Sequence, residues 1–311
     1  MTCLIATSVV RGSNQGDSHG GIYLVNLETD EILQPVDWNT IGIDWQGRGW
    51  DRGLRGIAFH DDHIFVAASD ELFLFNQDFQ VIDSFKSPYL KHCHEMSLFG
   101  NHLFITSTGF DSVIGFNIEK RAFDWALEVT TDGMRFSGRR YDPMGDDGPI
   151  QVNKLHLNSV FCDKHGMFIS GLRTGNLLTF NGKAIGAYTT LPEGIHNARP
   201  FKDGILFNDT RSDVLRYEAP EERAAYRVVR YPDHKLENRK LDDSRIARQG
   251  FGRGLCVIDE YLIAGGSSPS TITLYDLRQD KPIKIVNISM DIRNAIHGLE
   301  VWPYAWPAHR V

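Results

Sequence analysis

Short runs rich in β-branched, aliphatic and aromatic residues recur along the chain, and polar turns of Asn, Asp, Gly and Ser separate them. Runs bounded in this way are typical of β-strands. One pair of runs, joined by a short polar turn, occurs six times. The second run of each pair ends at Asn26, Asn76, Asn117, Asn181, Glu218 or Asp276. The pattern therefore predicts a repeated β unit with almost no helix.

The spacing of these units indicates the architecture. By subtraction, consecutive end points lie 50, 41, 64, 37 and 58 residues apart. Repeats of about 40–50 residues with four short strands each are typical of propeller blades. A further strand precedes every unit except the first, and one more strand ends the chain. These inner strands cover 55–59, 94–98, 156–160, 196–200, 253–257 and 297–301.

The last strand, 297–301, is expected to close the ring. The first unit begins directly with the run CLIATS, residues 3–8, and lacks an inner strand of its own. In closed propellers the C-terminal strand commonly takes that place and removes an open sheet edge. The sequence therefore predicts an all-β, six-bladed β-propeller in which residues 1–311 form a single domain. We expect a polar loop at 232–250, because its apolar positions are too sparse for an amphipathic helix.

Histidine recurs at one position of the inner strands. Alignment of the six strands places Arg55, His94, His156, His196, Arg253 and His297 at equivalent sites, which face the central axis in a propeller. A single channel histidine is more often held by a backbone carbonyl than by a metal. Four histidines at six such positions, however, have a chance probability on the order of 10⁻⁴ after allowance for register. The other eight of the 12 histidines show no such register.

This pattern predicts a metal centre with His94, His156, His196 and His297 as ligands. Neutral imidazoles without cysteine or carboxylate suit a divalent transition metal, with zinc and iron as the main candidates. They are poor ligands for Ca²⁺ and Mg²⁺, which prefer oxygen. Either all four histidines bind the metal, or three bind it and the fourth acts on the substrate.

Two arginines, Arg55 and Arg253, flank His297 around the predicted axis. One interpretation is structural: they pair with nearby acids, for which Glu95, Glu193 and Glu300 are candidates. The other is functional: two guanidinium groups beside a metal bind an anionic substrate. The residues alone leave both open.

Long connections are predicted on the face where the inner strands start, namely 9–20, 38–54, 130–154 and 231–252. Long loops over one end of an axis are where binding and catalysis usually occur. Two roles are open to the tryptophans of this region: they line the opening, or they anchor their own loop by packing. These residues are Trp38, Trp45 and Trp50. Glu95, Tyr141 and His19 are candidate acid/base groups, and a structural role is also open to each.

Composition narrows the class of partner. The net charge of −7, the pI of about 5.9 and the lack of a Lys/Arg cluster oppose nucleic-acid binding. No apolar run approaches the roughly 18 residues of a membrane span, and the N-terminus does not resemble a secretory signal. The four distant cysteines fit free thiols in a cytoplasmic protein. We therefore expect a small-molecule, anionic substrate.

The stretches RGIAFHDDHIFVAASDELFLFN (55–76) and IHGLEVW (296–302) resemble NHL-type six-bladed propeller repeats. Inner-strand histidines followed by a small or apolar residue are similar to the zinc ligands of the peptidyl-hydroxyglycine amidating lyases. His297 is the best match, followed by His94 and His156. The chain departs from that family in its fourth axial histidine, its two axial arginines and the absence of a signal. Carotenoid-cleaving propeller iron oxygenases resemble the four-His ligand set but have seven blades.

Two classes of function remain open. The first is a metal-dependent enzyme, of the lyase or hydrolase type with a Lewis-acid metal, or an oxygenase if the metal is iron. The second is a non-catalytic ligand-binding or scaffold propeller whose axial ring holds an anion or water. A metal-free hydrolase ranks third, because no Ser-His-Asp triad or carboxylate pair is placed by the pattern.

Overall fold

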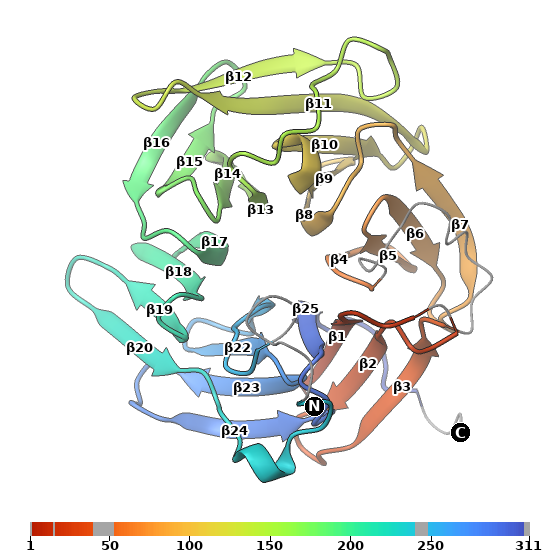
Figure 1. The fold of residues 1–311 in the computed structure, drawn as a ribbon, viewed down its shortest axis with the longest axis vertical. Coiled ribbons are helices and arrows are strands. Elements are labelled where there is room, and N and C mark those ends of the chain that lie inside the picture. The colour runs from red at the N-terminus through yellow and green to blue at the C-terminus, as the bar shows by residue number, and fades with distance from the viewer. Residues whose placement is uncertain (1, 15, 40–52, 240–247, 308–311) are drawn as a thin grey trace.

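Six antiparallel β-sheets surround a central axis (Figure 1) in a computed structural model that describes residues 2–14, 16–39, 53–239 and 248–307. Each sheet is one blade, and consecutive blades follow one another around the ring. The predicted all-β, six-bladed propeller is confirmed.

The first three blades contain strands 1–12 and the last strand of the chain. Blade 1 consists, from the axis outward, of β25 (Asn294–Val301), β1 (Cys3–Val10), β2 (Gly21–Asn26) and β3 (Ile32–Asp37). Blade 2 consists of β4 (Ile57–His60), β5 (His63–Ala68), β6 (Glu71–Phe75) and β7 (Val81–Lys86). Blade 3 consists of β8 (Cys93–Phe99), β9 (His102–Ser107), β10 (Ser112–Asn117), β11 (Ala122–Thr131) and β12 (Phe136–Tyr141).

The other three blades have four strands each. Blade 4 consists of β13 (Leu157–Asp163), β14 (Gly166–Gly171), β15 (Asn176–Phe180) and β16 (Ile185–Thr190). Blade 5 consists of β17 (Ile195–Phe201), β18 (Gly204–Asp209), β19 (Val214–Glu218) and β20 (Arg223–Arg227). Blade 6 consists of β21 (Leu255–Val257), β22 (Leu262–Ser267), β23 (Thr271–Asp276) and β24 (Pro282–Asn287).

The C-terminal strand closes the ring as the sequence predicts. Strand β25 pairs antiparallel with β1, so that Leu4 lies opposite Val301 and Val10 lies opposite Asn294. The two ends of the chain thereby share one sheet, and the inner edge of blade 1 is covered.

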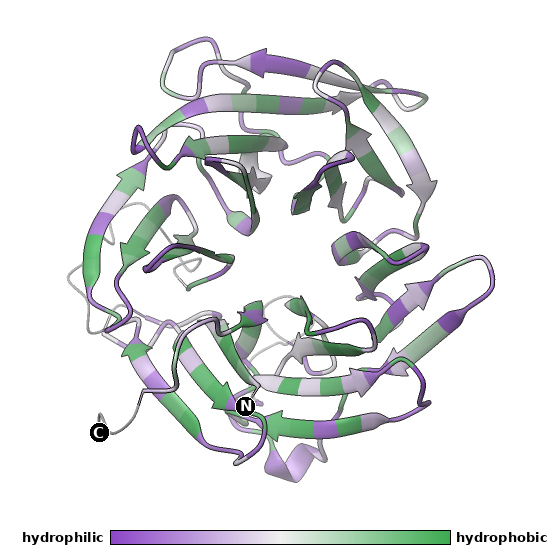
Figure 2. Cartoon of the chain, turned by 180° about the vertical axis from the view of Figure 1, so that it is seen from behind, coloured by the Kyte–Doolittle hydropathy of each residue, from purple (hydrophilic) through white to green (hydrophobic). Residues whose placement is uncertain are grey.

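Hydrophobic contacts between adjacent blades form the core, and Figure 2 shows hydrophobic residues along the strands and hydrophilic residues in the turns. Strands in the middle of a blade are covered on both faces, and every residue of β2, β6 and β10 is buried. Trp38 has no exposed surface and packs edge-on against Phe73, with ring centroids 4.9 Å apart. Trp38 therefore anchors its own segment, whereas Trp45 and Trp50 lie outside the described residues.

Part of the predicted loop at 130–154 is a strand, so that prediction was wrong there. Strand β11 extends to Thr131, and β12 folds back along it with Thr131 opposite Phe136 and Ala126 opposite Tyr141. Strand β12 is the fifth and outermost strand of blade 3, and most of its residues are exposed. Because only its end residues, Phe136 and Tyr141, are partly buried, its sequence FSGRRY lacks the hydrophobic alternation that would have revealed it.

The described residues contain no α-helix, and the two 3₁₀ turns are η1 (Thr108–Phe110) and η2 (Asp233–Lys235). Apart from η2, described residues of the predicted loop at 232–250 are irregular, and 240–247 lie outside the description. No helix in the described part of the chain has the length and apolar character needed to cross a membrane.

Candidate functional site

The four predicted histidine ligands converge on the axis, although they come from four different blades. The ring centroid of His94 lies 5.5 Å from that of His156, 6.2 Å from that of His196 and 6.3 Å from that of His297. We call these four residues the axial histidines. The innermost strands that carry or adjoin them, β8, β13, β17 and β25, surround the centre of Figure 1.

A β-bulge accompanies each axial histidine. The pairing register shifts between Cys93 and Met96 in β8, between Leu157 and Ser159 in β13, and between His196 and Arg199 in β17. It also shifts where β25 passes β1, next to His297. A bulge adds an unpaired residue and redirects side chains. Successive residues of the inner strands therefore face the axis, which strict strand alternation would not allow.

In three of these imidazole rings, the outer nitrogen, Nδ1, lies within hydrogen-bond distance of an oxygen atom of the chain. His94 Nδ1 lies 2.8 Å from the carbonyl oxygen of His92 and 2.8 Å from Thr108 Oγ1. His156 Nδ1 lies 2.9 Å from Asn153 Oδ1, and His297 Nδ1 lies 3.1 Å from the carbonyl oxygen of Ala295. A carbonyl oxygen only accepts, so Nδ1 carries the proton and donates it. The lone pair is left on Nε2, as in most metal-bound histidines.

The axial histidines are neutral. Burial lowers the pKa of His94, His196 and His297 well below the usual range, and the neighbouring guanidinium groups lower it further. Burial likewise lowers the pKa of His156 to about 3, with Arg173 as the next cause. His196 is buried, and neither of its ring nitrogens has a hydrogen-bond partner among the described residues. A buried imidazole without a partner is costly unless a ligand satisfies it.

The axial rings are spaced more widely than the ligands of one tetrahedral metal ion. With a metal–nitrogen bond of about 2.1 Å, the centre of a bound imidazole lies about 3.2 Å from the metal, so two ligand rings are at most about 6.4 Å apart. Only two rings on opposite sides of the metal reach this limit, and tetrahedral ligands have ring centres about 5.2 Å apart. All three measured separations exceed that value. Within the described ranges, no three His, Cys, Asp or Glu side chains are placed to hold a metal together. The rings would therefore have to move closer together to share an ion.

Both predicted substrate-binding arginines contact an axial histidine. Arg55 Nη1 lies 2.8 Å from His94 Nε2, and Arg253 Nη1 contacts His297 Nε2. Both arginines are buried. Burial lowers the pKa of Arg55 to about 10 and that of Arg253 well below its usual range, and Arg11 adds to both effects. The axis therefore carries a concentrated positive charge that attracts an anion.

The acids suggested as partners for these arginines are placed elsewhere. Glu193 pairs with Arg211 on the surface, 2.7 Å away. Glu95 and Glu300 face a separate cavity of about 260 Å³ together with Arg199. This cavity lies among the later residues of the inner strands, toward the face with the short turns, and we call it the far chamber. Its remaining lining residues are Ile57, Ala58, Phe59, Met96, Ser97, Leu98, Ser159, Val160, Phe161 and Asn197.

The three predicted acid/base residues are not brought together. Glu95 faces the far chamber, where burial raises the pKa of its carboxyl group and a hydrogen bond from Asn197 opposes that shift. Tyr141 ends the outermost strand of blade 3 and packs against Tyr89, with ring centroids 5.1 Å apart. Burial raises the pKa of Tyr141 above its usual value. Tyr141 therefore belongs to the packing of blade 3 and not to the axis.

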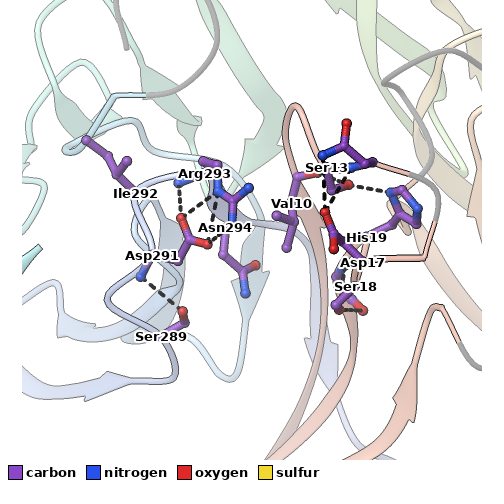
Figure 3. Close-up of polar contacts among 12 residues, drawn as sticks. Val10, Ser13, Asp17, Ser18, His19, Ser289, Asp291, Ile292, Arg293 and Asn294 are labelled. Carbon is purple, nitrogen blue, oxygen red and sulfur yellow. Dashed lines mark hydrogen bonds and ion pairs between the residues drawn. The ribbon is translucent and has the colours of Figure 1, made fainter. Parts of the chain in front are cut away.

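The third candidate, His19, lies in the loop between β1 and β2. It has no exposed surface, and its Nδ1 contacts the hydroxyl of Ser13, which in turn donates to the carbonyl oxygen of Val10 at 3.0 Å (Figure 3). The adjacent segment before β25 is held by Arg293, whose Nη2 lies 2.7 Å from Asp291. These bonds order the loop, so the structure supports a structural role for His19.

Several residues that shape the axis were missed from the sequence. Asp111, after η1, accepts hydrogen bonds from the backbone nitrogens of Leu155 and His156, both at 2.8 Å. Arg199 was missed as well. It follows the axial residue His196 by three positions, just as Glu300 follows His297. The other four inner strands carry a small residue or cysteine at this position, namely Ala58, Ser97, Ser159 and Cys256. A comparison of the six strands at this position would therefore have revealed the two charged residues.

Glu300 gives the protein a pH-dependent contribution to stability. Burial raises the pKa of Glu300 to about 7 from its ordinary value of 4.5, Arg199 lowers it, and Glu95 raises it. Because the folded state holds a proton that the unfolded state releases, this contribution is complete below pH 4.5 and is lost as the pH rises through about 7. Burial raises the pKa of the nearby Cys256 thiol, and Glu300 raises it further.

We expect Glu300→Gln to weaken the loss of stability between about pH 5 and pH 8, because Gln does not titrate. Urea unfolding at these two pH values measures the effect. The exposed Glu221→Gln variant is the control and should retain the wild-type difference. Equal pH dependence in Glu300→Gln and wild type would contradict the assignment.

Comparison with known proteins identifies the fold but no family. No protein-family model and no curated protein matches the chain. A chain of the crystal structure of a nidogen/laminin complex has a TM-score of 0.56 at 10% identity and covers 97% of this chain and 98% of that chain. A protein of unknown function from Bacteroides caccae has a TM-score of 0.55 at 10% identity, with 97% and 99% covered.

The structure of U3-55K has a TM-score of 0.49 at 11% identity. The match covers 77% of this chain and 66% of that chain, just under two thirds of its length. At 10% identity, the similarity to the nidogen/laminin chain and to the Bacteroides caccae protein shows the β-propeller fold alone.

Proposed function

We propose that this protein is a metal-dependent enzyme that acts on a small anionic substrate. The metal is held by His94, His156, His196 and His297, and zinc and iron are the candidates. The observation that supports the proposal most strongly is the anchoring of three outer ring nitrogens by oxygen atoms, which leaves neutral Nε2 lone pairs on the axis. The unpartnered ring of buried His196 supports it as well.

The chain's own residues would bind and orient the substrate. Arg253 and Arg55 contact the same Nε2 atoms that a metal requires, so metal binding would release their Nη groups toward the axis. A released guanidinium binds a carboxylate or phosphate with two parallel hydrogen bonds. The buried surroundings strengthen that attraction because little water competes. A bound divalent ion would supply Lewis-acid polarisation for elimination or hydrolysis, or oxygen activation if it is iron.

The proposal includes the finer points of the resemblance. The chain would be a single-domain, NHL-type propeller related in its metal site to the peptidyl-hydroxyglycine amidating lyases, with a different substrate. Its four cysteines are free and buried, which supports a reducing, cytoplasmic location. The acidic net charge of −7 favours a small-molecule partner over nucleic acid.

A second candidate function is non-catalytic anion binding. The contacts of Arg55 with His94 and of Arg253 with His297 favour it, because each uses the nitrogen that a metal would need. In that case the histidines position the guanidinium groups, and the ring binds an anion directly.

Metal content distinguishes the two functions. We expect protein purified without a His-tag or metal column to contain about one zinc or iron per chain by plasma mass spectrometry, and His156→Ala to lose most of it. The control is His165→Ala, which removes an exposed histidine in the turn between β13 and β14 and should retain the metal. The element found would separate Lewis-acid from redox chemistry.

Metal-free wild-type protein that also fails to take up added zinc or ferrous iron would exclude the metal site. Anion binding is then tested by titration with phosphate and with a dicarboxylate. Binding that Arg253→Gln abolishes would establish the second candidate.

A further inference from the structure

We propose that the far chamber is a second binding site, separate from the axial histidines, and that its ligand is a free α-amino acid. The proposal rests on three charged side chains that face one cavity without pairing with one another: Arg199, Glu95 and Glu300. They come from three blades, on β17, β8 and β25. It does not depend on the metal proposed above, because no axial histidine lines the chamber.

Arg199 provides the site for a carboxylate. Its guanidinium carbon lies 4.4 Å from the ring centroid of Phe161, so the aromatic ring covers one side of the group. No carboxylate among the described residues lies within ion-pair distance of Arg199, and its Nε is buried without an acceptor in that part of the chain. A stacked guanidinium with an open edge is suited to bidentate carboxylate binding.

Glu95 provides one acceptor for an ammonium group. Its Oε1 accepts a hydrogen bond from Asn197 Nδ2 at 2.9 Å. The amide of Asn197 cannot turn away, because its Oδ1 accepts from Asn208 Nδ2 at 3.0 Å and from the backbone nitrogen of Gly254 at 3.1 Å. Glu95 Oε2 is buried and has no hydrogen-bond partner among the described residues. The Ser159 hydroxyl and the Val160 backbone N–H are near enough to lower the pKa of this carboxyl group, although neither bonds to Oε2 directly. Asn197 therefore holds one oxygen, and the other can still accept from a ligand.

Glu300 provides the second acceptor from the closing strand. It is partly buried and lines the same cavity as Glu95. Each of the two carboxyl groups is electrostatically close enough to be affected by Arg199. Two carboxyl groups and one guanidinium that do not pair lack partners in a partly desolvated space. A ligand with both an ammonium and a carboxylate group offers a partner to each of them and adds no net charge.

Other ligand classes fit less well. A simple anion would be repelled by the two carboxylates. A calcium ion needs six to eight oxygen ligands, and the described residues hold no group of three His, Cys, Asp or Glu suited to a metal. The remaining walls include Ile57, Met96 and Val160. These apolar side chains favour an amino acid whose own side chain is apolar.

The test is calorimetric titration of the protein comprising residues 1–311 with each common L-amino acid. We expect at least one apolar amino acid to bind the wild type. Arg199→Met should weaken it roughly tenfold or more, since it removes the carboxylate partner and keeps an unbranched side chain of similar reach. Glu300→Gln should weaken it by a smaller factor. Arg211→Gln, which removes an exposed arginine paired with Glu193, is the matched control and should bind as the wild type does.

Several results would overturn the proposal. One is that no amino acid binds the wild type. Another is that the amine lacking the carboxylate binds as tightly as the amino acid, which would show a plain cation site. Arg199→Lys keeps the positive charge and serves as the second variant in case Arg199→Met does not fold. Undiminished amino-acid binding in both variants would also reject the site. His156→Ala should bind the amino acid normally, so loss of metal and loss of the amino acid are distinguishable.

Discussion

Gly298→Ala is expected to destabilise the folded protein by about 3 kcal/mol or more, because the closing strand has no space for a methyl group there. A Cβ atom at Gly298 would lie 2.2 Å from the carbonyl oxygen of Arg55 and 2.6 Å from Thr7 Oγ1. Thr7 Oγ1 already accepts a hydrogen bond from the backbone nitrogen of Gly298 at 2.9 Å and donates to the carbonyl of Arg55. Strand β25 would have to move away from both neighbours.

Denaturant unfolding, with the free energy extrapolated to water, measures this effect. Gly186→Ala is the matched control: nothing lies within 4 Å of an added Cβ, and the residue is in strand β16. We expect that control to change the free energy of unfolding by about 0.5 kcal/mol or less. A Gly298→Ala protein as stable as the control would show that the ring is not closed tightly at this point.

Asp111→Gly is expected to lower stability by about 2–4 kcal/mol and to reduce the metal content that the proposed function requires. The carboxylate accepts hydrogen bonds from the backbone nitrogens of Lys154, Leu155 and His156, so its removal leaves one buried and two partly buried N–H groups without this acceptor. Asp111 has a φ of 47°, a left-handed conformation that glycine adopts without strain. The expected loss of stability therefore comes from the missing carboxylate oxygens and not from backbone strain. Asp111 is a positioning residue for His156.

Unfolding free energy and metal content per chain are both measured for Asp111→Gly. Asp111→Asn keeps one oxygen acceptor and should lie between Asp111→Gly and the wild type. In the control, Asp132→Gly, the lost carboxylate accepts from the backbone nitrogens of Met134 and Arg135 in an exposed turn, where water replaces it. Stability and metal content of Asp111→Gly equal to those of the control would refute this role for Asp111.

The position of the axial histidines was predictable because it depends on repetition. The same strand start recurs six times, so residues 55, 94, 156, 196, 253 and 297 had to meet wherever six inner strands meet. The partners of those residues were not predictable. Thr108, Asn153 and Asp111 come from loops of variable length, and their contacts depend on how adjacent blades approach one another.

The side chains that follow the axial residues in the inner strands could not be placed from the sequence either. In a regular strand, His94 and Glu95 would point to opposite faces of the sheet. The bulge between Cys93 and Met96 instead allows His94 to join the axial ring and Glu95 to join the far chamber. No turn residue or hydrophobic pattern in CHEMSLF marks that bulge, so Glu95 was expected beside the histidines.

The sequence by itself determined most of the strands, the six repeats, the closure by residues 297–301 and the convergence of four histidines. These features follow from hydrophobic alternation, from turn residues and from the number of repeats, all of which can be read within one segment or between neighbouring segments. Only the tertiary structure decided the fifth strand of blade 3, the outward placement of Tyr141, the arginine contacts with His94 and His297, and the far chamber. Those features depend on bulges and on contacts between blades, where residues distant in sequence meet and compete for the same space and the same hydrogen bonds.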